Sequence, residues 1–225
     1  MKRPPIFITG TDTGVGKTVL TTLLAGFLRQ RGHRVAVCKP VCSGGRTDAR
    51  LLAAALGGEF SLDEINPWHF RAPIAPVLAA RREGQRVTLP AIVAHARQLQ
   101  KRGDVLLVEG AGGLLSPLGE NMDSRDLLVA LRAVPIIVGL NRLGVVNHLR
   151  LTLAALPSAA RARAMVVLMT PEMPDRSTPT NAVLLAEHFD AASVVGLPWL
   201  GQPVDFKGAL RTAHIRKILG RIVSL

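Results

Sequence analysis

The chain has 225 residues, of which 48% are hydrophobic and 20% are charged. This length and composition exclude disordered and fibrous classes and predict one globular domain spanning residues 1–225. The formal net charge of +12 comes from 28 Lys and Arg against 16 Asp and Glu. The basic residues are scattered and aromatic residues make up only 4%, so we expect an arginine-rich solvated surface rather than a nucleic-acid interface; an anionic small substrate fits the same charge.

Short apolar runs alternate with longer amphipathic segments along the chain, which is the pattern of an α/β fold. In chain order, the segments predict a strand at 6–9, a helix at 17–30, a strand at 34–38, helices at 48–56 and 89–101, a strand at 105–108, a helix at 123–132, a strand at 134–139, a helix at 147–156, a strand at 164–169, a helix at 180–188, a short strand near Val194 and a helix at 207–223. Continuously apolar strands predict a mainly parallel sheet with helices on both faces. In such a sheet, ligands bind beyond the carboxyl ends of the strands.

The apolar runs fall short of the roughly 20 residues that a membrane span needs. Cys38 and Cys42 have no second pair of Cys or His nearby, so neither a zinc site nor a disulfide framework is expected. These features predict a cytoplasmic protein without a membrane partner or an export signal.

Residues 10–18 read Gly-Thr-Asp-Thr-Gly-Val-Gly-Lys-Thr and connect the first predicted strand to the first predicted helix. In such a loop, glycines allow backbone N–H groups to surround a polyphosphate, Lys17 reaches the terminal phosphates and the Thr18 hydroxyl holds Mg²⁺. Thr11 stands where the usual G-x-x-x-x-G-K-[ST] pattern has its first glycine, because Gly10 lies one residue too early. The flanking elements and the intact Gly-Lys-Thr still predict a P-loop.

A lysine follows the second predicted strand, in the sequence Lys-Pro-Val-Cys-Ser-Gly at residues 39–44. At the ligand edge of the sheet, the Lys39 ammonium would neutralise charge that develops during phosphoryl transfer. The alternative is a lysine that points to solvent. Asp48, five residues after Ser43, is either a member of the same site or the N-cap of the following helix.

Glu109 follows the apolar run Val-Leu-Leu-Val, and glycines 110, 112 and 113 come after it. A P-loop usually works with a second metal-holding acid at the end of another strand, and glycines there allow the backbone to approach phosphates or substrate. Alone, such an acid is as often a helix cap or a surface group; beside a P-loop, the metal role is favoured. Asp126 is expected to cap or solvate a helix. Asn147 opens a helix whose N-terminus suits a carboxylate, with a simple cap as the alternative.

Together these motifs resemble the ATP-dependent dethiobiotin synthetase family, which closes a cyclic urea on 7,8-diaminopelargonic acid in biotin biosynthesis. The matching motifs occur in the order of that family, namely residues 10–18, Lys39-Pro-Val with Ser43-Gly44, Ile65-Asn66-Pro67, residues 108–113, Leu143-Gly144 with Asn147-His148, and Pro198-Trp199-Leu200. The resemblance implies a P-loop NTPase-like, three-layer architecture.

The resemblance also implies roles for individual residues. The residues that would bind ATP are Gly14, Val15, Gly16, Lys17, Thr18, Val19, Glu109, Gly110, Ala111, Gly112, Pro198, Trp199 and Leu200. Those that would bind Mg²⁺ are Thr18, Asp48 and Glu109. Lys17 and Lys39 would be catalytic groups beside the γ-phosphate, and Thr13 and Ser43 would contact the substrate. In the family, CO₂ forms a carbamate on one amine, the carbamate attacks ATP, and the second amine closes the ring with loss of phosphate.

The family is a homodimer with its sites at the subunit interface, which would place Asn147 on the neighbour's substrate carboxylate. Two features depart from the family. Leu168-Met169 stands where a base-reading Asn-Asp is expected, so nucleoside triphosphates other than ATP are expected to serve as co-substrates. The chain also has no Tyr, whereas the family commonly uses a Tyr of the partner chain on the substrate carboxylate.

A second interpretation is a regulatory ATPase that resembles partition and septum-site proteins, whose nucleotide cycle drives dimerisation or DNA association. Their loop carries an additional Lys where this chain has Asp12, which favours the ligase. A third is an amide-forming, cobyrinate-type relative, against which the short chain counts.

Overall fold

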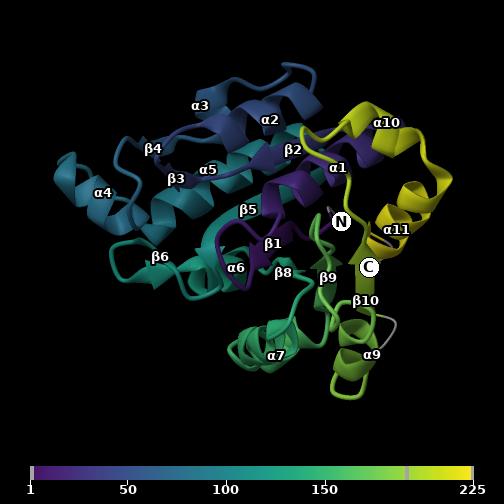
Figure 1. The fold of residues 1–225 in the computed structure, drawn as a ribbon. Helices are drawn as coiled ribbons and strands as arrows, with labels where there is room; N and C mark the ends of the chain where they lie inside the picture. The colour runs from purple at the N-terminus through teal and green to yellow at the C-terminus, as the bar shows by residue number, and fades with distance from the viewer. Residues whose placement is uncertain (1–2, 191–192, 224–225) are drawn as a thin grey trace.

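The computed structural model describes residues 3–190 and 193–223. Its centre is a six-stranded sheet with the strand order β10-β9-β8-β1-β5-β2, in which every neighbouring pair is parallel (Figure 1). The strands are β1 (Ile6–Gly10), β2 (Val35–Cys38), β5 (Val105–Gly113), β8 (Val134–Leu140), β9 (Met165–Met169) and β10 (Val194–Leu197). Their residues are almost all buried because helices cover both faces, which is why the strands are continuously apolar.

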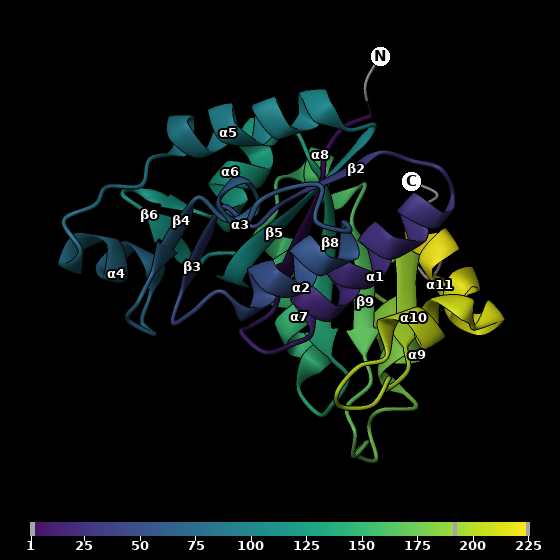
Figure 2. The same cartoon turned by 90° about the horizontal axis from the view of Figure 1, so that it is seen from above.

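One helical layer is organised around α1 (Lys17–Gln30), which contacts α2 (Thr47–Ala55), α10 (Phe206–Arg211) and α11 (Ala213–Val223). On the opposite face, α5 (Leu89–Arg102) and α6 (Ser124–Leu131) pack against each other and against β5, as right-handed crossovers require (Figure 2). Next to them, α7 (Val145–Ala154) contacts β8, and α9 (Asn181–Ala186) contacts α7 and β10. The structure confirms the three-layer α/β fold.

Several short elements were not predicted. They are β3 (Val41–Ser43), β4 (Trp68–Phe70), α3 (Leu62–Ile65), α4 (Pro76–Arg82), β6 (Pro117–Gly119), β7 (Met122–Asp123) and α8 (Ser158–Arg161). β3 pairs with β4 in parallel, and β6 pairs with β7 in antiparallel fashion. Elements this short are marginal in isolation and form through tertiary contacts, which a local pattern does not report.

Most predicted elements agree with the structure to within about two residues at each end, and two differ more. The strand at 105–108 continues to Gly113, so Glu109 lies within β5, opposite Ile8 of β1, and the register shifts just beyond this pair. The single helix expected at 207–223 is two helices, because the backbone of Thr212 is extended, with ψ 120°.

Two capping alternatives are wrong. The N-cap of α2 is Arg46, so Asp48 lies inside the first turn and is free to face another element. The N-cap of α7 is Gly144, with φ 91°, and no side-chain cap bond is formed, so Asn147 does not cap this helix. The expectation for Asp126 is confirmed, because it forms a capping box with Asp123 at the start of α6.

In parallel strands, the carboxyl ends share one edge of the sheet. The loops after β1, β5 and β2 therefore meet there, since β5 lies between the other two. None of the helices in the described part of the chain is long and apolar enough to cross a membrane.

Candidate active site

The P-loop between β1 and α1 depends on three glycines. Gly14 and Gly16 have φ of 75° and 96°, in the left-handed region that favours glycine. A Cβ on Gly16 would lie 2.9 Å from Cε of Met169, and a Cβ on Gly10 would lie 2.7 Å from Cγ2 of Val15. The early glycine of the motif thus makes room for the Val15 side chain, which is buried beneath the loop.

Lys17 lies at the start of α1 and is only 7% exposed. Its ammonium donates to the carbonyl oxygen of Asp12 at 2.7 Å. Burial lowers the pKa of Lys17 to about 8, and the nearby Lys39 contributes in the same direction, while Glu109 opposes the shift. A buried ammonium whose hydrogen bond goes to a neutral carbonyl is electrostatically suited to receive a polyphosphate.

Four predicted residues come together beside this loop. The Thr18 hydroxyl donates to Oε1 of Glu109 at 2.7 Å. The Lys39 ammonium donates to the same Oε1 and to Oδ2 of Asp48, at 2.6 Å each. Lys39 is 4% exposed and Glu109 is fully buried. The structure therefore rules out the alternative in which Lys39 points to solvent.

The position of Lys39 follows from the register of the sheet. Cys38, the last residue of β2, pairs with Val108, so the next residues of the two strands are Lys39 and Glu109. Burial by itself would lower the pKa of Lys39, but the carboxylates of Glu109 and Asp48 outweigh it and raise this pKa above its usual value. Lys39 therefore carries its charge throughout the neutral range.

The same residues fit a magnesium ion. Oε2 of Glu109 is buried and has no hydrogen-bond partner, which leaves a carboxylate oxygen available as a ligand. The Asp48 side chain is half exposed, and the Thr18 hydroxyl lies between the helix and Glu109. Two carboxylates beside a hydroxyl suit Mg²⁺, which takes one or two protein carboxylates and otherwise binds water and phosphate oxygens.

Other predicted residues lie on neighbouring loops. Thr13 is exposed at the tip of the P-loop. Its hydroxyl would be 3.7 Å from a Cβ placed on Gly112, so the end of β5 runs beside the P-loop. The Ser43 hydroxyl donates to the carbonyl oxygen of Ile74 at 2.6 Å.

Two groups of predicted residues form no hydrogen bond or ion pair with the Lys39 cluster in the described part of the chain. Asn147 is exposed on α7. Pro198, Trp199 and Leu200 follow β10, and Trp199 is 41% exposed. The Thr170 N–H donates to the carbonyl oxygen of Leu197, so the loops after β9 and β10 are adjacent. Val19 is partly buried and packs against the core.

Sequence reasoning assigned no role to the residues that support these loops, although Asn66 belongs to the Ile-Asn-Pro motif that resembles the family. Asn66 is fully buried beside Lys39. Asp175 accepts the N–H of Leu143 at the start of α7, and hydrogen bonds from Ser177 and from this N–H lower the pKa of Asp175 to about 2. The Ile-Asn-Pro motif at residues 65–67 was the only signal for Asn66 in the sequence. No local signal indicated that Asp175 contacts Leu143, which lies 32 positions earlier in the chain.

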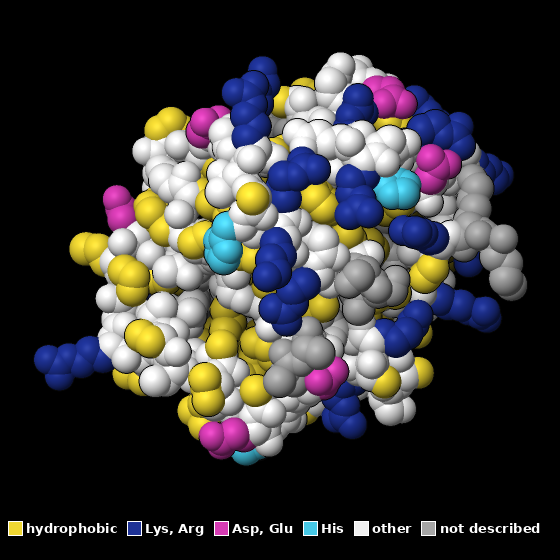
Figure 3. Space-filling model, turned by 90° about the vertical axis from the view of Figure 1, so that its right-hand side faces the viewer, with side chains coloured by type: hydrophobic (Ala, Val, Ile, Leu, Met, Phe, Trp, Pro, Cys, Tyr) yellow, Lys and Arg dark blue, Asp and Glu magenta, His cyan; other side chains and the backbone are white. Residues whose placement is uncertain are grey.

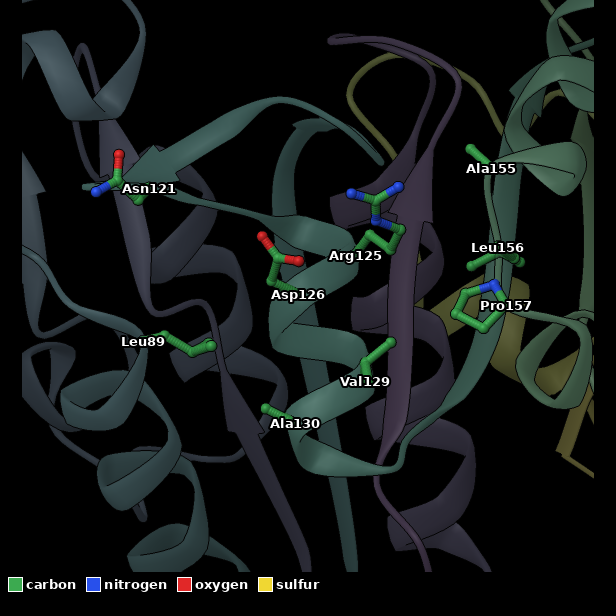
Figure 4. A pocket seen from close by; sticks show the side chains of 9 residues that line it. All are labelled: Leu89, Asn121, Arg125, Asp126, Val129, Ala130, Ala155, Leu156 and Pro157. Carbon is green, nitrogen blue, oxygen red and sulfur yellow. The ribbon is translucent and has the colours of Figure 1, made fainter.

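An open cavity of about 800 Å³ lies away from this cluster, between α6 and the segment that joins α7 to α8 (Figure 4). Its lining residues are Leu89, Asn121, Arg125, Asp126, Val129, Ala130, Ala155, Leu156 and Pro157. None of the residues of the Lys39 cluster lines this cavity. We therefore locate the candidate site by its chemical groups and not by cavity volume.

The basic residues are spread over the surface, as Figure 3 shows for the face that carries the last helices. Arg216 of α11 donates to Oε1 of Gln30 and lies 5.6 Å from the ring centroid of Phe27. This arginine thus joins α11 to α1 rather than extending into solvent.

The fold and the site define a P-loop nucleotide-binding protein of the α/β class. A family model described as an AAA domain matches residues 5–205. The chain is 44% identical over 221 residues to the ATP-dependent dethiobiotin synthetase BioD of Anaeromyxobacter sp. (strain Fw109-5), with 96% of this chain and 92% of that protein covered. It is 42% identical to the protein of the same name from Xanthomonas axonopodis pv. citri (strain 306), with 69% and 73% covered. The chain belongs to the ATP-dependent dethiobiotin synthetase family.

Solved structures confirm the fold. The MinC:MinD cell division protein complex of Aquifex aeolicus matches with a TM-score of 0.61 at 16% identity, covering 98% of this chain and 94% of that one. A ParA family ATPase from Chlorobium tepidum matches with a TM-score of 0.62 at 10% identity, covering 99% and 100%. At such identities, the likeness concerns architecture alone.

Proposed function

We propose that this protein is an ATP-dependent carbon–nitrogen ligase, dethiobiotin synthetase, that forms the ureido ring of dethiobiotin from 7,8-diaminopelargonic acid and CO₂, with release of ADP and phosphate. The observation that carries the proposal is the buried Lys39 ammonium, held between Glu109 and Asp48 beside a P-loop. Family membership at 44% identity supports the same reaction.

In the proposed mechanism, backbone N–H groups from Gly14 to Thr18 surround the ATP phosphates. Lys17 and Lys39 flank the γ-phosphate and stabilise the charge that develops as the phosphoryl group moves to the carbamate oxygen. Thr18, Asp48 and Glu109 would hold Mg²⁺. When bound, this ion would neutralise negative charge on the phosphate oxygens.

Substrate contacts are proposed for two hydroxyl groups around this centre. Thr13 lies on the loop after β1 and Ser43 ends β3, and both would orient the diamine and its carbamate. Loss of phosphate follows when the second amine attacks the carbamate carbon. Residues 110–112 and 198–200 would contact the nucleotide from the neighbouring strand ends. We propose that the chain acts as one P-loop domain and that the reaction takes place in the cytoplasm. Cys38 and Cys42 are buried and form no disulfide, which is compatible with a reducing compartment.

The regulatory ATPase is the weaker candidate. Its support is the structural likeness to MinD and ParA, which lies at 10–16% identity and shows only the fold. The P-loop of this chain has Asp12, a carboxylate, at the position where the partition and septum-site proteins carry a Lys. The Lys39 cluster also gives this chain a second buried ammonium for chemistry on a metabolite.

Phosphate release should depend on both the diamine and bicarbonate, because the carbamate is the group that accepts the phosphoryl. The assay supplies ATP, Mg²⁺, bicarbonate and diaminopelargonate and omits each in turn. We expect background rates without the diamine. Equal turnover in its absence would support the regulatory ATPase and contradict the ligase.

A homodimer is proposed from the surface around Asn147. Leu151 lies one turn further on the same face of α7 and is 63% exposed, and Leu143, just before the helix, is 79% exposed. Val129 of α6 is 47% exposed at the cavity of Figure 4. A second copy covering this apolar surface would also bring Asn147 toward the partner's substrate.

Leu151→Asp should therefore yield monomers with low activity, since a buried carboxylate opposes association. Sedimentation velocity at assay concentrations measures the state, with Val183→Asp, an exposed apolar site on α9, as the matched control. A wild-type monomer with full activity would contradict the proposed dimer.

Relaxed nucleotide choice is proposed from β9. Leu168 is fully buried and Met169 lies against Gly16, so neither offers the hydrogen bonds by which a buried Asn rejects the wrong base. We expect CTP, GTP and UTP to support a substantial fraction of the ATP rate. Measuring kcat/KM for the four triphosphates tests this, and an ATP preference above about 10³-fold would exceed what apolar contact provides.

A further inference from the structure

The backbone of Lys39 leaves the sheet at a difficult point. The ladder between β2 and β5 ends at the pair Cys38 and Val108. Pro40, the next residue, has no N–H with which to continue it. Lys39 is nevertheless 4% exposed, and a buried carbonyl oxygen without a partner is costly. The orientation of the Lys39 side chain therefore depends on whatever satisfies this backbone.

Asn66 supplies that hydrogen bond. Its Nδ2 donates to the carbonyl oxygen of Lys39 at 2.7 Å and to that of Trp68 at 3.4 Å. The Lys39 N–H donates to the carbonyl oxygen of Ile65 at 2.8 Å. Residues 65 and 66 thus hold both backbone polar groups of Lys39, and the Asn66 side chain has no exposed surface.

Asn66 also contacts the loop that leads to Asp48. Its Oδ1 accepts from the Cys42 thiol at 3.0 Å, and its carbonyl oxygen accepts from Nη2 of Arg46 at 2.8 Å. Arg46 is the N-cap of α2, the helix whose first turn carries Asp48. One residue is therefore bonded to the backbone of Lys39 and to the start of the helix that carries its partner.

The helix that precedes Asn66 is held in place by its own contacts. This helix is α3, which begins with a capping box between Ser61 and Glu64. The Glu64 carbonyl oxygen lies 2.7 Å from the His95 ring nitrogen, and the Glu64 carboxylate pairs with Arg102. His95 and Arg102 both belong to α5, so α3 is held against the long helix that packs on β2 and β5.

We infer that Asn66 is a positioning residue for Lys39. Its carboxamide fixes the backbone from which the lysine ammonium is directed between Glu109 and Asp48. The inference rests on the proposed function, in which Lys39 acts on the γ-phosphate. A lysine side chain is flexible, so an unsupported backbone would let the ammonium settle away from the reacting oxygens and slow the chemical step.

Two substitutions test this. Asn66→Ala removes the whole carboxamide. Asn66→Asp keeps its shape, but an ionised carboxylate cannot donate to the Lys39 carbonyl oxygen. For both, we expect kcat to fall by about 10–100-fold, the range typical of groups that orient a functional side chain. KM for ATP should change by less than about threefold, because the P-loop contacts remain.

The Lys39→Met background distinguishes positioning from a general loss of structure. If Asn66 acts through the ammonium, then Asn66→Ala in this background should lower the residual single-turnover rate by less than about twofold. Leu219→Ala, at a fully buried position of α11, is the control for lost stability; it should lower Tm without changing kcat of the folded enzyme.

Normal kcat in Asn66→Asp, or equal losses with and without the Lys39 ammonium, would overturn the inference. A wild-type protein that turns over equally well without the diamine would instead contradict the proposed function, so the two failures are distinct.

Discussion

Lys39→Met is expected to lower kcat by about 10²–10³-fold, the loss typical when one group that stabilises transition-state charge is removed. Methionine has a similar length and no charge, so the change removes the ammonium that lies 2.6 Å from both Glu109 and Asp48. Phosphate release at saturating ATP, diamine and bicarbonate measures the effect. Lys207→Met, a change on α10, is the matched control and should retain the wild-type rate.

The same substitution should also affect stability. Removing one partner of a buried ion pair typically costs about 3–5 kcal/mol, because the remaining charge is left unpaired. Glu109 is fully buried, so Tm of Lys39→Met should fall in the absence of Mg²⁺ and recover in part when Mg²⁺ is added. Near-normal kcat in Lys39→Met would show that the ammonium is structural, and the proposed chemistry would then lack its second cation.

Glu109→Gln is expected to raise the Mg²⁺ concentration that gives half-maximal rate by about 10–100-fold or more. Glutamine preserves the shape and one oxygen, but it removes the charge and replaces the unpartnered Oε2 with either a weaker ligand or a donor. Lys39 keeps Asp48 as a partner, so the fold should survive.

The measurement is a Mg²⁺ titration of initial rate at fixed ATP. Glu120→Gln is the control, because Glu120 is an acid in a surface pair with Arg81. If the titration of Glu109→Gln superimposes on that of the wild type, Glu109 does not contact the metal and its role is limited to holding Lys39 and Thr18.

The P-loop, the central strands and the positions of Lys39 and Glu109 could be predicted from the sequence, for local reasons. Glycine spacing dictates the loop, and apolar runs followed by Lys39 and Glu109 place these side chains at one edge of a parallel sheet. The place of Asp48 in this cluster followed only from the resemblance to the family, because the local pattern fitted a helix cap equally well. The break at Thr212 and the continuation of β5 to Gly113 could not be predicted, because neither has a strong local signal.

The contacts that support the Lys39 cluster could not be predicted from a local pattern, for a different reason. Asn66 reaches Lys39 across 27 positions of the chain, and β3 and β4 exist only because their segments meet in space. Both are consequences of tertiary structure, and a single sequence contains no periodicity that reports them.

The contact between Met169 and Gly16 restricts how nucleotide choice can be redesigned in this enzyme. The end of β9, where a base-reading side chain is expected, is also the wall against which the phosphate loop rests. Replacing Met169 with Asn to add a hydrogen bond to adenine would shorten that wall and leave the loop less well packed. Selectivity for the base and affinity for the phosphates would then have to be optimised together, with a compensating change at a second position.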